Sequence, residues 1–560
     1  MHLLESAGDR DAALPIELPG NDDGWRDGRR LLWRPDIAAL RHQSSSPPSG
    51  HVHASPWLHQ TFITGRAPPA AELLQLQASK MSAVHIFPGR LVELAPELLE
   101  LVLSFLTPRD LVSFGRTCRR AAAFIRPDNQ ILWRRSFLQV FDDPTHAWEL
   151  LQPTARAGNR DREAHWDWFQ EVQRRLTAFN AICHNGNAAL LSDPESIITT
   201  LLDVLETASY SESTGVNTRI SFNLEFLDRI FRSAPNPERI VHDYHRDIES
   251  VSLPVEPLNN CNRPITRSML GRKATVPQWA SRFHIFHGMT KREENSVLAK
   301  AAARSLIYDW RTTGPNADYG PFLNDKSGIV NWQVLEAATS LMLRIFEGTR
   351  GSYLRTPAGF RDSIPCLLPL NPSCKEDWAG VTRIWLGTYA FLDYRALVHY
   401  NFANNLEYPM DLGAYEEACG DIMRLKLKIN DSDELKYDHR LQTDLPICED
   451  LPVLYFTGSS SGRSTGRPPI LVRGSTSLIP GGRQVRWRFI FSYAGADQWQ
   501  LEGVQPGGIR SGGIFGIWSH CDHDDHSPVG PFCYFPFELC DPSQKSHELV
   551  HTDYISLSGM

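Results

Sequence analysis

The sequence lacks the long apolar runs, the paired cysteines and the signal segment that mark membrane or secreted proteins. No uninterrupted apolar stretch approaches the roughly 18 residues that a membrane-spanning helix needs. The ten cysteines include no Cys-x-x-Cys pair, and they are spread from Cys118 to Cys540, whereas disulfide frameworks crowd cysteines into a small module. Residues 1–18 lack the basic and then apolar pattern of a secretory signal. We therefore expect a reduced compartment, cytoplasmic or nuclear, and no membrane partner.

The chain also lacks an excess of positive charge. Its 57 lysines and arginines are outnumbered by 65 acidic residues, which gives a net charge of −8. This balance argues against a protein whose whole surface binds nucleic acid, so we expect no nucleic-acid partner. Hydrophobic residues at 42% and charged residues at 22% are typical of an ordinary globular chain, and 560 residues leave room for about three to five domains.

Composition and periodicity divide the chain into five parts. Residues 1–85 contain a Ser/Pro-rich run and many breaks, which predicts a mostly disordered leader. Residues 141–377 are predicted to be mainly helical with long loops, 251–285 being a long connection, and 541–560 a tail. The segments with helical periodicity are Trp166–Phe179, Ile197–Leu205, Leu224–Phe231, Val297–Trp310 and Trp332–Phe346.

Residues 378–540 change from a helical period to a period of two. In Ile422–Ile429 and Gln484–Phe491, apolar side chains alternate with basic or polar ones, which predicts half-buried strands with one wet face. The further strand candidates are Ile384–Phe391, Leu454–Thr457, Ile470–Ile479, Gln498–Val504 and Ile514–Ser519. Sequential strands at this spacing favour an antiparallel barrel or sandwich, so the expected fold class is α+β.

Residues 91–135 hold the most informative pattern. From Leu98 to Leu106 every position is apolar except Glu100 and Ser104, so a helix there needs cover on more than one side. Thr107 is the expected N-cap of a second helix that begins at Pro108. Cys118 with two arginines opens a third helix, and Leu132-Trp133-Arg134 closes the unit. Three helices this short cannot bury so much apolar surface among themselves, so the rest of the protein or a partner must cover it.

The segment from Leu94 to Arg120, which reads LAPELLELVLSFLTPRDLVSFGRTCRR, closely resembles the F-box. One departure is Ala95, where the family usually has proline; Pro96 follows one place later. The resemblance implies a three-helix unit at 86–140 that docks on the Skp adaptor of a cullin–RING ubiquitin ligase. It also implies that the rest of the chain presents an unknown protein substrate. The positions that the resemblance assigns to adaptor binding are Leu94, Pro96, Leu98, Leu101, Val102, Leu106 and Leu111.

Two further features accompany this resemblance. Residues 81–140 carry eight arginines, no lysine and five acids, a local excess of positive charge that suits steering of an acidic partner. Patches between residues 85 and 540 are similar to a fungal, basidiomycete-type F-box family. These patches include Phe137–Pro144, Ile307-Tyr-Asp-Trp310, Tyr319–Phe322, Leu392–Arg395, Trp487-Arg-Phe489 and Gly507–Ser511.

Three other motifs have a chemical and a structural interpretation. His520–His526, with Cys533 and Cys540 downstream, offers zinc or calcium ligands, but its spacing matches neither a zinc finger nor an EF-hand, so we expect a polar loop. Gly458–Gly462 matches the G-x-S-x-G pattern of hydrolases around Ser460, but no helix-forming sequence follows, which favours a flexible loop. Gly507–Gly516 matches no nucleotide-binding pattern, so its glycines are expected to serve turns or bulges.

The aromatic side chains of the β region leave a choice between a pocket and a core. Trp385, Tyr389, Trp487, Trp499 and Trp518 could line a binding pocket with Arg486, Arg488 or Arg510, but such residues more often fill a barrel core. The leading hypothesis is a non-catalytic ubiquitin-ligase subunit without cofactor, metal or catalytic residues. The alternative is a small-ligand-binding β-barrel protein with a degenerate F-box, and a hydrolase built on Ser460 is a third hypothesis.

Overall fold

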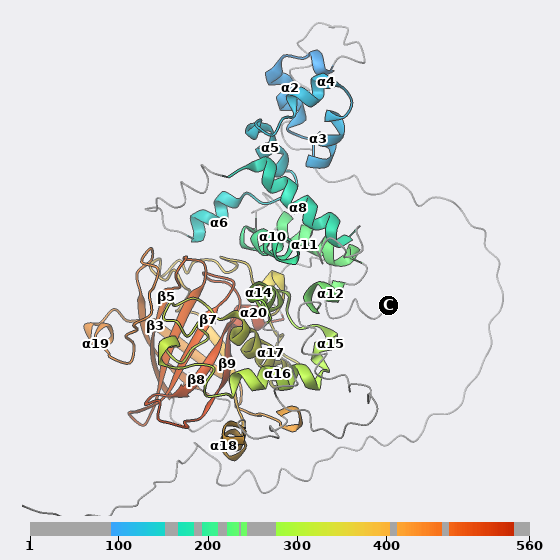
Figure 1. The fold of residues 1–560 in the computed structure, drawn as a ribbon. Helices are drawn as coiled ribbons and strands as arrows, with labels where there is room; N and C mark the ends of the chain where they lie inside the picture. Colours follow the sequence, from blue (N-terminus) through green and yellow to red (C-terminus); the bar gives the residue numbers. More distant parts are fainter. Residues whose placement is uncertain are drawn as a thin grey trace, which may run out of the picture. The chain divides into compact units, whose positions relative to one another are not determined.

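The structure is a computed structural model that describes residues 91–151, 166–183, 193–210, 221–234, 237–242, 276–403, 412–461 and 470–542. Residues from Phe87 onward form one compact unit, so the helical and β regions that the sequence left as one body or two belong together (Figure 1). The predicted leader and all but the first residues of the predicted tail lie outside the described residues.

A group of short helices opens the described chain. After the 3-10 helix η1 (Leu91–Glu93) come the four α-helices α2 (Pro96–Leu103), α3 (Pro108–Gly115), α4 (Arg119–Phe124) and α5 (Gln130–Phe137). The predicted N-cap is confirmed, because the Thr107 hydroxyl accepts from the Asp110 amide. The third helix begins at the predicted place, where Cys118 is itself the N-cap and its thiol accepts from the Ala121 amide. The sequence predicted three helices closed by Leu132–Arg134; those residues instead lie in α5, where the Asn129 side chain caps the helix.

The helical middle follows. Its α-helices are α6 (Pro144–Leu151), α8 (Trp168–Cys183), α10 (Pro194–Glu206), α11 (Phe222–Ser233), α12 (Pro237–His242), α14 (Gln278–His287), α15 (Lys291–Glu294), α16 (Val297–Ile307) and α17 (Trp332–Thr349). The five predicted helical segments are confirmed. Among the described residues, no helix combines the length and the apolar composition needed to cross a bilayer.

Helix α14 corrects the prediction that residues 251–285 are a connection. It begins at Gln278 and buries Ser281, His284 and His287 together with its apolar side chains. Because the polar residues are buried too, the sequence shows no apolar stripe with a helical period. The predicted connection up to residue 275 lies outside the described residues.

The C-terminal region is an eight-stranded antiparallel β-barrel. Its strands are β1 (Ile384–Phe391), β3 (Met423–Ile429), β4 (Leu454–Ser461), β5 (Ile470–Leu478), β6 (Val485–Tyr493), β7 (Ala496–Gln505), β8 (Ile514–His520) and β9 (Val529–Pro536). They pair in chain order, and the pairing of β1 with β9 closes the barrel, while β2 (Ala418–Cys419) adds to the end of β1. All seven predicted strands are confirmed, and the structure selects the barrel over the sandwich.

Strand β9 was missed by the sequence analysis for a physical reason. Phe532 and Tyr534 face the barrel interior, while Cys533 and Phe535 belong to the cluster between the barrel and the helices. A strand that is buried on both faces reads as a continuous apolar run and loses the period of two.

Aromatic side chains fill the barrel, which confirms the core interpretation. Trp487 and Phe489 on β6 meet Trp385, Phe456 and Phe532 from other strands, and all five are buried. Small residues face them: a Cβ built on Gly474 would lie 2.5 Å from the ring of Phe456, and one on Gly503 would lie 2.8 Å from the ring of Phe532. An eight-stranded barrel is just wide enough to be filled in this way.

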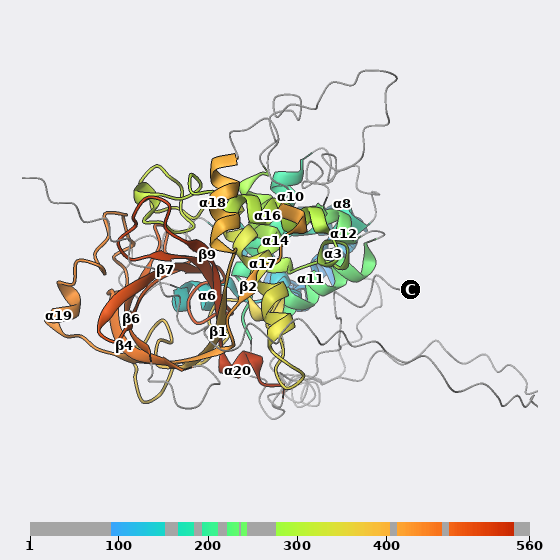
Figure 2. The ribbon, with the colours of Figure 1, turned by 90° about the horizontal axis from the view of Figure 1, so that it is seen from below.

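Helices cover one side of the barrel. Helix α17 packs on β1, β8 and β9, and the rings of Phe346 and Phe535 lie 4.7 Å apart across this contact. Figure 2 shows the helices gathered beside β9 and β1, with β4 and β6 on the far side of the barrel. Within the region predicted as β, the connections also contain η4 (Leu412–Ala414), α18 (Tyr394–Ala403), α19 (Asp433–Lys436) and α20 (Phe537–Cys540).

Candidate functional site

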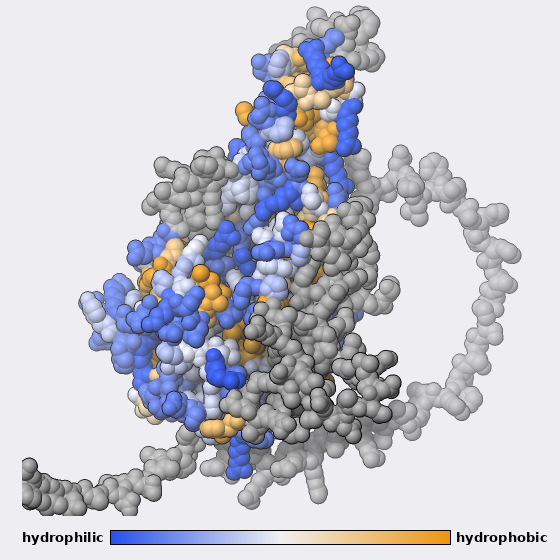
Figure 3. Space-filling view, viewed as in Figure 1, coloured by the Kyte–Doolittle hydropathy of each residue, from blue (hydrophilic) through white to orange (hydrophobic). Residues whose placement is uncertain are grey.

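Helix α2 has two apolar faces with different environments. Leu99 and Leu103, four residues apart, are buried in a core that continues into α8, α10 and α11. On the other face, Leu98 is 53% exposed, and Leu101, Val102 and Phe105 are 46%, 43% and 53% exposed. Leu98, Leu101 and Val102 lie on one face of α2 at the i, i+3, i+4 spacing, and Phe105 follows in the turn after the helix. We call them the α2 stripe, and apolar surface is visible around these helices in Figure 3.

The predicted adaptor positions divide between surface and interior. Leu94, Pro96, Leu98, Leu101 and Val102 are exposed. Leu106 is only partly buried and packs against the core, and Leu111 is fully buried. These last two positions therefore shape the surface from beneath, and the adaptor contact itself stays a prediction.

Sequence reasoning missed two exposed apolar residues beside this surface. Phe105 extends the α2 stripe, and Val112 on α3 is 38% exposed. Phe105 lies seven residues after Leu98, so the helical spacing alone could have identified it.

Helix α5 and the residues just after it hold the turn that follows α2. The Ser136 hydroxyl donates to the Leu106 carbonyl at 2.9 Å, and the Gln139 amide donates to the Ser104 carbonyl at 3.3 Å. These carbonyls lie at and beyond the C-cap of α2, where the helix itself supplies no donor, so the two bonds satisfy groups that would otherwise need water. The α2 stripe therefore rests on a fixed support.

Positive charge borders this surface. Arg116, Arg119 and Arg120 are exposed, and none of them forms an ion pair with another described residue. Part of the local arginine excess is thus exposed, while Arg126, Arg134 and Arg135 pair with acids of the same region.

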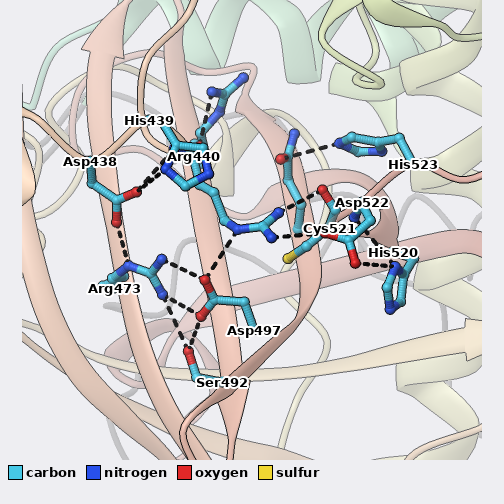
Figure 4. Close-up of polar contacts among 12 residues, drawn as sticks. Asp438, His439, Arg440, Arg473, Ser492, Asp497, His520, Cys521, Asp522 and His523 are labelled. Carbon is cyan, nitrogen blue, oxygen red and sulfur yellow. Dashed lines mark hydrogen bonds and ion pairs between the residues drawn. The ribbon is translucent and has the colours of Figure 1, made fainter.

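A cluster of charged side chains lies on the outer wall of the barrel (Figure 4). Arg473 on β5 bonds Asp438 at 2.6 Å and Asp497 through two bonds of 2.6 and 2.7 Å. The hydrogen bonds from Arg473 lower the pKa of Asp497 to about 2. Arg440 bonds Asp522 at 2.8 Å and lies 3.2 Å from Asp497. Both arginines of this cluster are therefore paired with carboxylates of the protein itself.

The His520–His526 segment forms the connection from β8 to β9, as the polar-loop interpretation predicted. His520, Asp522 and Asp524 bring ligand atoms within 4.8 Å of one another, but Asp522 is already paired with Arg440. His523 stacks on Tyr319 at 3.6 Å, and burial lowers its pKa to about 4.

The downstream cysteines do not join this loop. Cys533 and Cys540 are buried between the barrel and the helices, whereas Cys521 belongs to a separate small cluster. The ligand types that the sequence places close together along the chain are therefore distributed among different parts of the fold.

Ser460 lies in a strand and not in the flexible loop that was predicted. Gly458–Ser461 continue β4, where they pair with β3, and Gly458–Ser460 pair with β5 as well. Ser460 is 1% exposed, and its hydroxyl has no hydrogen-bond partner among the described residues. A buried hydroxyl without a neighbouring base has no means of activation, so nothing here supports a hydrolase.

The glycine-rich segment 507–516 packs against another loop. A Cβ on Gly507 or Gly512 would lie 2.2 Å from the carbonyl oxygen of Ser363 or Asp362, respectively. The role of these two glycines is therefore close backbone approach, while Gly508, at a φ of +87°, serves the turn after β7.

Arg486 and Arg488 correct the pocket hypothesis. Their side chains alternate with the inward aromatic residues of β6, so they lie on the outer wall. There both pair with Glu502 and Asp318. Arg510 instead donates to the carbonyls of Leu368 and Trp378. The filled interior does not favour the ligand-binding alternative, which stays a prediction.

Comparison with known proteins identifies one part of the chain. Residues 96–139, which contain α2–α5, match the F-box-like domain family. No curated protein and no solved structure matches the chain at a significant level. The narrower likeness to a fungal family stays a prediction. The α2 stripe and the helices that support it thus lie in an F-box-like domain at residues 96–139.

Proposed function

We propose that this chain is the substrate-receptor subunit of a Skp–cullin–RING ubiquitin ligase. Its F-box-like domain binds the Skp adaptor, and the remainder, with the β-barrel as the main reader, holds a protein substrate. The subunit acts in the cytoplasm or nucleus and carries no catalytic residues of its own, because ubiquitin transfer belongs to the RING subunit and its conjugating enzyme. The match to the F-box-like family supports the adaptor-binding role in kind.

The observation that carries the proposal is the α2 stripe. Leu98, Leu101, Val102 and Phe105 are large apolar side chains that the protein's own core leaves exposed. Fully burying one such side chain is worth about 1.5–3 kcal/mol, and three on one helix face, with Phe105 in the following turn, suit a partner with an apolar groove. A partner that covers the stripe removes a surface that is otherwise costly to leave in water.

The test is binding of the purified full chain to the Skp adaptor. We expect the L101A/V102A/F105A variant to bind at least about 100-fold more weakly, because truncating a buried anchor residue commonly costs 2 kcal/mol or more. Its circular dichroism spectrum should match that of the wild type, since the three side chains are exposed.

The matched control truncates exposed apolar residues elsewhere. Ile329 is 48% exposed and Tyr353 is 52% exposed, and both lie far along the chain from the F-box-like domain. The I329A/Y353A variant should bind the adaptor like the wild type. Adaptor binding that survives the α2 variant, or a wild-type chain that binds no adaptor, would contradict the proposal.

A further inference from the structure

Strand β3 presents three exposed cations on the outer wall of the barrel that pair with no other residue the structure describes. Arg424, Lys426 and Lys428 are exposed, while Leu425 and Leu427 between them are buried in the barrel core. Residues two apart on a strand lie about 6.6–6.8 Å from one another on the same face. The three cations therefore form a straight row, here called the β3 row.

The β3 row differs from the other basic residues of the barrel strands. Arg473 on β5 and Arg486 and Arg488 on β6 are each held by carboxylates. In contrast, the three side chains of the β3 row form no hydrogen bond or ion pair with any described residue. The arginines of β5 and β6 are thus neutralised by nearby carboxylates, whereas the three cations of the β3 row have no such partner among the described residues.

Strand β4, which pairs with β3, places hydroxyl side chains and not acidic ones opposite the three cations. In the β3–β4 register, Arg424 lies opposite Ser461, Lys426 opposite Ser459, and Lys428 opposite Thr457. Directly opposed residues on neighbouring strands have Cβ atoms about 4.5–5.5 Å apart. Each cation therefore has a neutral hydrogen-bonding neighbour, which can bind an anion alongside it without repelling it. Leu471, opposite Ser459 on β5, adds a 58% exposed apolar side chain.

Among the described elements, no helix packs extensively on β3. Helix α17 packs on β1, β8 and β9, and the short α19 packs on β4. In Figure 1, β3 lies on the side of the barrel away from α16 and α17.

From the row, the hydroxyls and this uncovered wall, we infer that the β3 row docks an acidic peptide segment of a partner protein, in extended form, with Asp or Glu at alternate positions. An extended peptide places alternate side chains on one face at the same spacing as the row, so three carboxylates meet three cations in register. Since β3 is already paired with β1 and β4, the contact is made by side chains and adds no strand. The inference rests on the proposed function, because it assigns a chemical class to the substrate of the proposed receptor.

Fluorescence polarisation of the full chain with labelled 12-residue peptides tests the inference. The first peptide carries Asp at three alternate positions, the second has Asn in their place, and the third has the same three Asp residues adjacent to one another. We expect the alternating Asp peptide to bind best and to weaken as salt rises, because surface ion pairs are screened. The R424Q/K426Q/K428Q variant should bind it about 10-fold more weakly, because it loses three exposed ion pairs.

The matched control removes the same charge elsewhere. Lys326, Lys375 and Arg395 are exposed and are not part of the row, so the K326Q/K375Q/R395Q variant should bind like the wild type. The R424E/K426E/K428E variant should lose the Asp peptide and gain a peptide with three alternate lysines. Equal binding of the Asp and Asn peptides, or of the wild type and the row variant, would overturn the inference. So would tighter binding of single-stranded DNA or of phosphatidylserine vesicles than of the alternating peptide.

The same row variant separates this inference from the proposed function. It should bind the Skp adaptor with unchanged affinity, because the row lies on the barrel and not in the F-box-like domain. Loss of adaptor binding by the α2 variant with intact peptide binding would support both. A wild-type chain that binds the peptide but no adaptor would refute the receptor role and leave the docking surface standing.

Discussion

At the scale of single residues, Glu502 organises the outer wall of the barrel. It is 1% exposed and accepts hydrogen bonds from the Nε atoms of both Arg486 and Arg488. Asp318 completes the group by accepting from the Nη2 atoms of the same arginines at 2.6 and 2.8 Å. Burial alone raises the pKa of Asp318, but the two arginines outweigh it and hold that pKa below its ordinary value. Two buried cations thus depend on two carboxylates.

Replacing Glu502 by glutamine should therefore be costly. The E502Q variant leaves two buried guanidinium groups with one carboxylate, and breaking a buried ion pair costs about 3–5 kcal/mol. Denaturant titration should show a lower free energy of unfolding by about this amount, whereas E434Q, at an exposed glutamate, should change it little. A loss as small as that of E434Q would contradict the account.

His284 makes the stability of the helical region depend on pH. Its Nδ1 lies 2.5 Å from Glu336 and its Nε2 lies 2.6 Å from Glu293. Burial alone lowers the pKa of His284, but the two glutamates reverse this and raise it from 6.5 to about 10. A raised pKa in the folded state means that its stabilisation is complete below pH 6.5 and is lost as the pH rises through about 10.

The denaturation temperature should therefore fall between pH 7 and pH 10. We expect a smaller fall in E336Q, because removing one carboxylate lowers the pKa of His284. Thermal melts in a pH series measure the difference, and E294Q, at the exposed neighbour of Glu293, serves as the control that should follow the wild type. Identical pH profiles for wild type and E336Q would contradict this role.

The sequence predicted a solvent-exposed face for both β3 and β6, but only β3 has one. The sequence pattern of β3 and β6 is the same, yet Arg424, Lys426 and Lys428 are exposed whereas Arg486 and Arg488 are each 5% exposed. The difference comes from Asp318, which lies 168 residues before Arg486 along the chain. No local pattern contains that distant carboxylate.

At the scale of elements, helix α2 has two apolar faces, one buried in the protein's own core and one exposed. Its sequence is apolar on most sides, which predicts cover on more than one face. The structure assigns Leu99 and Leu103 to the protein's own core and leaves Leu98 and Leu101 exposed. If the proposed adaptor contact is made by the exposed face, stability and binding depend on different residues of the same helix.

Truncations on the two faces of α2 should separate these effects. L103A should lower the free energy of unfolding by about 2–5 kcal/mol, because it leaves a cavity in a buried site. L101A should change it by no more than about 0.5 kcal/mol while weakening adaptor binding. Denaturant unfolding and an adaptor-binding assay on both variants provide the measurements. A destabilised L101A with normal adaptor binding would reverse the assignment of the faces.

At the scale of the whole molecule, the helices and the barrel share their apolar cores. Phe535 of β9 is fully buried against Phe346 of α17, and Arg483, just before β6, bonds Glu206 of α10 at 2.6 Å. The F-box-like domain joins the middle in the same way, since the ring of Trp133 packs edge-on to Phe169 at 4.9 Å. Residues from Phe87 onward accordingly form one compact unit.

A truncation at the barrel–helix contact should then affect both sides. F535A should cost about 3–5 kcal/mol, and hydrogen exchange read by mass spectrometry should accelerate in α17 as well as in β9 and β1. The control I329A truncates a 48% exposed side chain and should leave exchange unchanged. Faster exchange confined to the barrel would show that the two regions unfold independently.

Local pattern determined much of this protein from the sequence alone. The cap at Thr107, the start of the helix after Cys118, the helical periods of the middle and seven of the barrel strands depend on contacts within a few residues, so they can be read along the chain. The F-box-like segment is recognisable for the same reason. Tertiary structure alone decided the closure of β1 on β9, the exposure of Leu101 beside the buried Leu103, and the exposure of the β3 row without a partner among the described residues. These features depend on which distant residue arrives to cover an apolar face or neutralise a charge, and only the assembled fold specifies that.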